Sequence, residues 1–140
     1  VVQKGKDLTI VSYGSTFNLC EAAAKVLLEM QIEVTLIDVQ TLIPFDINHD
    51  IVSSLKETNR LLIVDEDVSS GATAYMLDKI MVEQKGYYHL DAAPATLSAK
   101  DHRPPYGTDG DYFSKPSIDD IVEKAYQIMH ESNPKKFPAL

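Results

Sequence analysis

The sequence predicts a single α/β domain in which helices cover both faces of a mostly parallel sheet. Short runs of aliphatic and β-branched residues at 8–13, 33–38 and 60–64 alternate with longer stretches whose apolar residues recur at helical spacing. The runs are apolar on successive positions, as is typical of strands that are buried on both faces. The length of 140 residues suits one domain. Strands and helices that alternate in this order form parallel sheets.

The first predicted helix follows the strand at 8–13. Gly14 ends that strand, and Ser15 or Thr16 can cap the helix. Its apolar residues form one stripe: Leu19, Ala22, Ala23, Val26, Leu27 and Met30. Cys20, the sole cysteine, lies in this helix, so no intrachain disulfide is possible, and we expect it to be a small buried apolar residue.

A loop after the strand at 33–38 leads to a second helix, which Asp46 or Asn48 can start. The strand at 60–64 runs into the carboxylates Asp65, Glu66 and Asp67. Neighbouring residues of an extended chain point to opposite faces, so we expect this acidic run to be a polar turn that attracts a cation or another domain, not a catalytic pair. A third helix carries Leu77, Ile80 and Met81 on one side, and a weaker strand follows at 94–98.

Residues 100–116 are rich in Pro, Gly, Asp and aromatic residues and are predicted to form a long packing or interface loop. Ser117 caps the last helix, in which Asp119 and Asp120 occupy the first turn, where the helix dipole favours negative charge. The tail 133–140 is expected to be too short and proline-rich to fold alone.

The formal net charge is −8, which disfavours binding to nucleic acid or to an anionic membrane and favours a basic protein partner. No apolar run approaches the roughly 18 residues that a membrane-spanning helix needs. Because the chain opens at Val1 without a methionine, we expect it to be a piece of a longer polypeptide.

No residue set has a catalytic, cofactor-binding or metal-binding arrangement. The histidines do not have the close spacing of ligand pairs on one helix face; they are His49, His89, His102 and His130. The turn at 14–16 lacks the glycine pattern of phosphate-binding loops, so we interpret it as a plain turn and cap. Residues 109–111 read Asp-Gly-Asp, whereas the diphosphate motif of thiamine enzymes begins with Gly-Asp-Gly. Because the order is inverted, we do not interpret this segment as that motif.

Four segments together resemble one family. Residues 38–46 read DVQTLIPFD and resemble the Asp-(Leu/Val)-Arg-Thr-(Leu/Ile)-x-Pro-x-Asp segment of transketolase carboxy-terminal domains. Residues 56–66 read KETNRLLIVDE and resemble the Lys-x-Thr-x-Arg strand of the same domains. Residues 90–94 read LDAAP, are followed by Asp101, and are similar to the Leu-Asp-Ala-Pro stretch of the β-subunits of pyruvate and branched-chain 2-oxo acid dehydrogenases. Residues 5–14 match the opening strand.

The resemblance implies a three-layer α/β/α fold over residues 1–140, with a mixed, mostly parallel five-stranded sheet whose first strand, at 1–3, runs antiparallel at an edge. It also implies that the full-length enzyme uses thiamine diphosphate and Mg²⁺, oxidatively decarboxylates a 2-oxo acid and passes the acyl group to a lipoyl acyltransferase. The cofactor lies on other domains, so this domain binds none and is not active alone.

The domain's implied partners are the other domains or subunits of a homo-oligomeric decarboxylase and the small basic subunit-binding domain of the acyltransferase. In the family, the Asp of Leu-Asp-Ala-Pro takes an arginine of that domain, which assigns partner binding to Asp91. The implied location is the bacterial cytoplasm or the mitochondrial matrix.

Two departures from the family pattern have consequences. Gln40 replaces the usual Arg, which predicts the loss of one interface ion pair. The long loop and tail look more like the variety in which both subunit types are fused and the substrate is branched-chain. Alternatives are another thiamine enzyme, of the transketolase or deoxyxylulose phosphate synthase type, which activity on sugar phosphates would favour, and a standalone binding module, which a natural length of about 140 residues would favour.

Overall fold

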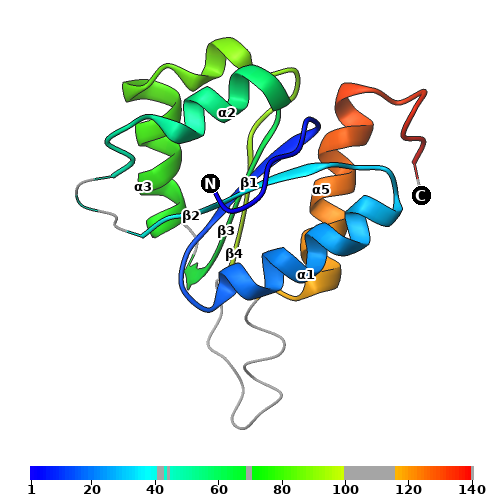
Figure 1. Ribbon diagram of the computed structural model, residues 1–140, viewed down its shortest axis with the longest axis horizontal. Helices are drawn as coiled ribbons and strands as arrows, with labels where there is room; N and C mark the ends of the chain where they lie inside the picture. Colours follow the sequence, from blue (N-terminus) through cyan, green and yellow to red (C-terminus); the bar gives the residue numbers. More distant parts are fainter. Residues whose placement is uncertain (41–42, 44, 69–70, 100–115, 140) are drawn as a thin grey trace, which may run out of the picture.

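The computed structural model describes residues 1–40, 43, 45–68, 71–99 and 116–139. Within these residues, four strands form one parallel sheet in the order β2-β1-β3-β4 (Figure 1). The strands are β1 (Leu8–Ser12), β2 (Val34–Asp38), β3 (Leu61–Val68) and β4 (Ala95–Ala99). Strand β1 is central, and its Ile10 pairs with Leu36 of β2 on one side and with Leu62 of β3 on the other.

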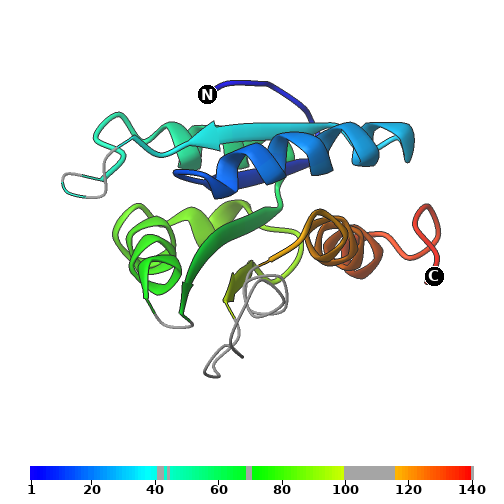
Figure 2. The same ribbon diagram turned by 90° about the horizontal axis from the view of Figure 1, so that it is seen from below.

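Helices cover both faces of the sheet (Figures 1 and 2), which confirms the three-layer α/β/α prediction. One face carries α1 (Thr16–Glu29) and α5 (Ile118–Ser132), and the other carries α2 (Asp50–Thr58) and α3 (Ala72–Asp78). Helix α3 continues into a π-helical turn, η1 (Lys79–Glu83), which is followed by a short 3-10 helix, η2 (Gly86–His89). No helix of the described chain is long and apolar enough to cross a membrane.

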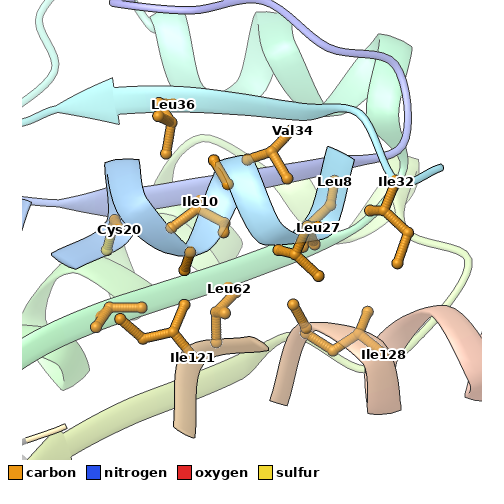
Figure 3. Packing of buried hydrophobic residues seen from close by; sticks show 14 of the residues in the cluster. Leu8, Ile10, Cys20, Leu27, Ile32, Val34, Leu36, Leu62, Ile121 and Ile128 are labelled. Atoms are coloured by element: carbon orange, nitrogen blue, oxygen red, sulfur yellow. The ribbon is translucent and has the colours of Figure 1, made fainter. Parts of the chain in front are cut away.

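The larger core lies between the sheet and the helices α1 and α5 (Figure 3). Ile10 and Leu62 of the sheet meet Leu27 of α1 and Ile121 of α5, all of them fully buried. Cys20 is also fully buried there, as predicted, and burial raises the pKa of its thiol to about 11. A thiol that stays protonated in an apolar core is unreactive, so Cys20 serves in packing.

The second core lies between the sheet and the helices α2 and α3, and Val11, Ile51, Leu55, Met76 and Ile80 are buried in it. Alternate residues of β1 supply the two cores, as expected for a strand that is covered on both sides. Asp46 precedes α2 and accepts the backbone N–H groups of Asp50 and Ile51 at 2.9 and 3.2 Å, which supports its predicted role in starting the helix.

The predicted antiparallel edge strand at 1–3 is reduced to one bridge, between Gln3 and Leu36, so the sheet formed by the described residues has four strands and not five. The reason is local. After that bridge, Gly5 pairs with a side chain: its N–H donates to Thr35 Oγ1, and the same hydroxyl donates to the Gly5 carbonyl, both at 2.8 Å. The chain thereby leaves the ladder and turns into β1.

The acidic run at 65–67 belongs to β3, so the prediction of a polar turn there is wrong. Strand β3 keeps pairing with β4 as far as Val68 by means of a register shift between Val64 and Val68. Asp65 is 1% exposed, and its carboxylate accepts a hydrogen bond from the Tyr13 hydroxyl at 3.0 Å. A buried carboxylate with a phenol donor is compatible with a strand interior, which composition alone did not indicate.

Helix α5 begins as predicted. The Ser117 side chain accepts the backbone N–H of Asp120, and the Asp120 carboxylate accepts the backbone N–H of Ser117, so both donors are satisfied. Residues 100–115 of the predicted interface loop, including His102 and the Asp-Gly-Asp run, lie outside the described residues.

The tail after α5 packs back onto that helix. Phe137 is 5% exposed and joins the larger core, where its ring meets Tyr126 edge-on at 6.1 Å. The Tyr126 hydroxyl donates to the Pro138 carbonyl, and Nδ1 of His130 lies 2.7 Å from the Phe137 carbonyl oxygen. The tail therefore gains its structure from α5 and does not need to fold by itself.

Candidate functional site

Asp91, the sole residue to which the sequence assigns partner binding, lies between η2 and β4 with an exposed side chain. Its backbone is fixed although its carboxylate is free to meet solvent: the Asp91 N–H donates to the Asn59 carbonyl at 2.8 Å. Asn59 precedes β3, so Asp91 lies at the amino end of the sheet. The carboxylate is therefore presented on an ordered turn.

Asn59 fixes this turn with two groups. It is the C-cap of α2, in a left-handed conformation with φ of 61°, and its N–H donates to the Leu55 carbonyl at 2.9 Å. Asparagine tolerates this conformation better than most residues. Its side-chain Nδ2 then donates to the His89 carbonyl at 2.8 Å. The turn from His89 to Asp91 is thus bound to Asn59 on both sides of Leu90.

The other end of the segment is fixed by Gly86, which is buried against η1. A Cβ at this position would lie 2.9 Å from the Ile80 carbonyl oxygen and 3.0 Å from the end of the Met81 side chain. Only a residue without a side chain allows this close approach. The segment 86–91 is therefore anchored at both ends, by Gly86 on η1 and by Asn59 on the end of α2.

Arg60, the next residue after Asn59, fixes the end of α5 in the same region. Its Nε donates to Ser132 Oγ at 2.6 Å, and its Nη1 donates to the Asp7 carbonyl at 3.0 Å. Two consecutive residues thus join the Asp91 turn, the carboxyl end of α5 and the segment before β1. The amino end of the sheet is one connected unit.

Two exposed tyrosines precede Asp91 in the same segment of the chain. Tyr87 and Tyr88 are 51% and 69% exposed, and their ring centroids lie 4.3 Å apart with the planes tilted by 31°. A hydrogen bond with the Tyr88 side chain raises the pKa of Tyr87 above its ordinary value, because it stabilises the protonated phenol. The sequence analysis did not identify these residues, although two adjacent tyrosines, four and three positions before Asp91, were a usable signal.

The other candidates that lie in the described residues do not assemble into a site. His49 precedes α2, His89 ends η2 and His130 lies on α5, while His102 is outside the described residues. Over the part of the chain that the structure describes, no three side chains of His, Cys, Asp or Glu could hold a metal ion together. The turn at 14–16 leads directly into α1.

Gln40, which replaces the arginine of the family pattern, donates from Nε2 to Asp38 Oδ2 at 3.0 Å on the surface. Asp38 and Gln40 line an open cleft of about 330 Å³ together with Asp46 and Asp50. The Asp46 carboxylate already accepts two backbone N–H groups of α2, and partial burial raises its pKa. In this cleft, the Asp46 carboxylate therefore serves to cap helix α2.

Comparison with known proteins gives concordant results. The model of the family "Transketolase, C-terminal domain" matches residues 1–121. The chain is 34% identical over 123 residues to "Pyruvate dehydrogenase E1 component subunit beta" of Acholeplasma laidlawii, covering 87% of this chain and 36% of that protein. The mitochondrial protein of that name from Dictyostelium discoideum is 29% identical over 128 residues, covering 91% of this chain and 35% of that protein.

The chain thus spans little more than a third of these two relatives. Among solved structures, the inactive beta4 tetramer of a split gene transketolase matches with a TM-score of 0.76 at 19% identity, over 95% of this chain and 42% of that chain. That likeness shows the fold alone. Taken with the layered sheet and the family model, it leads to one conclusion: the chain belongs to the transketolase C-terminal domain family.

Proposed function

We propose that this chain is the assembly and docking domain of a thiamine-diphosphate-dependent 2-oxo acid dehydrogenase, in which residues 1–140 are one domain of a longer protein. The single observation that carries the docking role is that the exposed Asp91 lies on a turn that Asn59 binds at both His89 and Asp91. Similarity to pyruvate dehydrogenase β-subunits over most of the chain supports the enzyme class.

In the proposed enzyme, thiamine diphosphate with Mg²⁺ supplies the decarboxylation of the 2-oxo acid, and the acyl group passes to the lipoyl acyltransferase. In this proposal, the cofactor site is built by other domains of the enzyme. The role of this domain is to hold subunits together and to keep the acyltransferase close to the site of reaction.

The proposed docking partner is the small, basic subunit-binding domain of the acyltransferase. The net charge of −8 favours its approach, and Asp91 pairs with one of its arginines. The energy of such a pair depends on how far binding removes water from it. An exposed pair contributes about 0–1 kcal/mol, whereas removal of one partner from a desolvated interface pair costs about 2–5 kcal/mol.

The proposed location is the bacterial cytoplasm or the mitochondrial matrix. One of the similar β-subunits is bacterial, and the other is named as mitochondrial. In the complete enzyme, the domain packs beside other subunits of the same decarboxylase in a homo-oligomer. The substrate is a 2-oxo acid of the pyruvate or branched-chain class.

Titration calorimetry of the protein with the subunit-binding domain of a lipoyl acyltransferase tests the docking role. Loss of a desolvated pair in Asp91→Ala should raise Kd by about thirtyfold or more. Asp119→Ala is a matched control, because Asp119 is also an exposed aspartate but lies in the first turn of α5. If Asp91→Ala binds as tightly as the native protein, the assignment of docking to Asp91 is wrong.

A further inference from the structure

Besides Asp91, the segment carries the tyrosine pair Tyr87 and Tyr88, neither of which belongs to a hydrophobic core. The two rings contact each other, and both side chains are at least half exposed. Single exposed apolar side chains are normal on protein surfaces. Two adjacent aromatic side chains that stack on each other in solvent are less usual, and tyrosine is enriched among the residues that dominate binding energies at interfaces.

The backbone on either side of the tyrosine pair is fixed by contacts with the rest of the domain. Gly86 is packed against Ile80 immediately before the tyrosines, and Asn59 binds His89 and Asp91 immediately after them. Within the turn, the Tyr88 N–H lies 3.3 Å from the Lys85 carbonyl oxygen, to which it donates. Less conformational entropy is lost when a partner binds a segment that is already ordered, so such a surface binds more tightly for the same contacts.

The chemistry of the turn selects the partner. Tyrosine faces attract cations, and the planar guanidinium group of arginine also stacks on them, whereas the ammonium group of lysine does not stack. Asp91 lies three residues beyond Tyr88 and offers the two oxygens that a guanidinium group binds in parallel. A stable interface buries about 800 Å² on each partner, and Tyr87, Tyr88 and Asp91 all lie within one five-residue segment.

We propose that Tyr87, Tyr88 and Asp91 form one contact surface for an arginine-bearing basic segment, with the tyrosine pair as its aromatic anchor. The proposal rests on the proposed docking function and names the further residues that carry it. Lys85, which opens the turn, has the wrong charge for such a partner and opposes it.

The first test measures binding of the acyltransferase subunit-binding domain by calorimetry. Tyr87→Ala and Tyr88→Ala should each raise Kd by about tenfold, the effect of a buried interface tyrosine, and Phe at either position should restore most of the affinity because the ring face remains. Lys85→Ala should lower Kd. Leu28→Ala, a change at a 60% exposed side chain on α1, is the matched apolar control and should leave Kd unchanged.

Salt dependence separates the two halves of the surface. Removal of the Asp91 charge should flatten the dependence of Kd on ionic strength, whereas the tyrosine variants should keep the native slope, because screening acts mainly on the ion pair. If Asp91→Ala weakens binding and both tyrosine variants bind like the native protein, the aromatic anchor is wrong while the docking function stands.

The second test does not depend on the acyltransferase. Oligo-arginine and oligo-lysine peptides of equal length are titrated into the protein, with tyrosine ring resonances as the readout. The native protein should bind the arginine peptide about threefold to tenfold more tightly, and Tyr87→Ala/Tyr88→Ala together should abolish this preference. Equal affinity for the two peptides, or a preference that survives the double substitution, overturns the proposal even if the acyltransferase domain binds elsewhere.

Discussion

The carbonyl of Asn59 accepts the backbone N–H of Asp91 at 2.8 Å, although the two residues lie on different elements and are far apart in the chain. The left-handed conformation of Asn59 ends α2 and turns its carbonyl and side chain toward the Asp91 turn. The presentation of the candidate docking residue therefore depends on how helix α2 ends.

Substitutions at Asn59 should separate backbone strain from side-chain bonding. Asn59→Gly tolerates φ of 61° and loses the side-chain hydrogen bonds to the His89 carbonyl, at 2.8 Å, and to the Leu55 carbonyl, at 3.4 Å, so we expect a loss of about 1–2 kcal/mol in the free energy of unfolding. Asn59→Ala loses the same bonds and adds about 1–2 kcal/mol of left-handed strain. Urea unfolding of the two variants measures the difference. Equal stability of Ala and Gly would show that the conformation at this position costs nothing.

Gly5→Ala should detach the segment before β1. A Cβ at Gly5 would lie 2.5 Å from the Glu33 carbonyl carbon and the Val34 nitrogen, both of which are backbone atoms that cannot move aside. We expect a destabilisation of about 1–3 kcal/mol and faster hydrogen exchange of the Leu36 amide, which donates to the Gln3 carbonyl. Lys4→Ala, at an exposed side chain, is the control. Unchanged protection of Leu36 in the glycine variant would contradict this expectation.

Phe137→Ala should release the tail from α5, because the ring fills part of the larger core and is 5% exposed. Phe-to-Ala changes in cores cost about 3–5 kcal/mol, and we expect the lower end since the tail can relax. Tyr126→Phe keeps the edge-on ring contact and loses only the bond to the Pro138 carbonyl, for about 1 kcal/mol. Thermal unfolding compares the two. A Phe137→Ala protein as stable as Tyr126→Phe would mean that the ring contributes little.

The Asp46 carboxyl should make stability depend on pH in the acid range. Burial raises its pKa in the folded state above the ordinary 3.8, and the backbone N–H groups of Ile51 and Asp50 offset this only in part. The protonated Asp46 carboxyl therefore stabilises the folded state below pH 3.8, and this stabilisation is lost as the pH rises through the folded-state pKa. As the pH rises from 3.8 through that pKa, the native protein should lose stability relative to Asp46→Asn. Urea unfolding of both proteins across the interval checks the sign, and a constant difference would contradict it.

Much of the fold could be predicted because its signals are local. The apolar run at 8–13 and the helix cap at Ser117 follow from residue types and spacing, and both agree with the structure to within a residue. The burial of Cys20 followed from the helical stripe around it. These features depend on neighbours within a turn or two of the same element.

The features that were not predicted depend on distant partners. Asp65 looked like a surface turn residue because its partner, Tyr13, lies far away in the sequence, directly after strand β1. The packing of the tail could not be predicted because Phe137 is stabilised by Tyr126 and by a core that α1 and α5 form together. Likewise, nothing near Asp91 in the sequence indicates that Asn59 fixes its turn.

The central position of β1 has a consequence for how the chain acquires its structure. Both neighbours of β1 in the sheet come later in the chain: β2 follows α1, and β3 follows α2. Parallel pairing between segments so far apart closes long loops before it gains contacts, and such topologies fold slowly. We therefore expect an early intermediate in which one side of β1 remains unpaired. An apolar strand with an open edge readily joins other chains, so dilute refolding should give a higher yield than concentrated refolding.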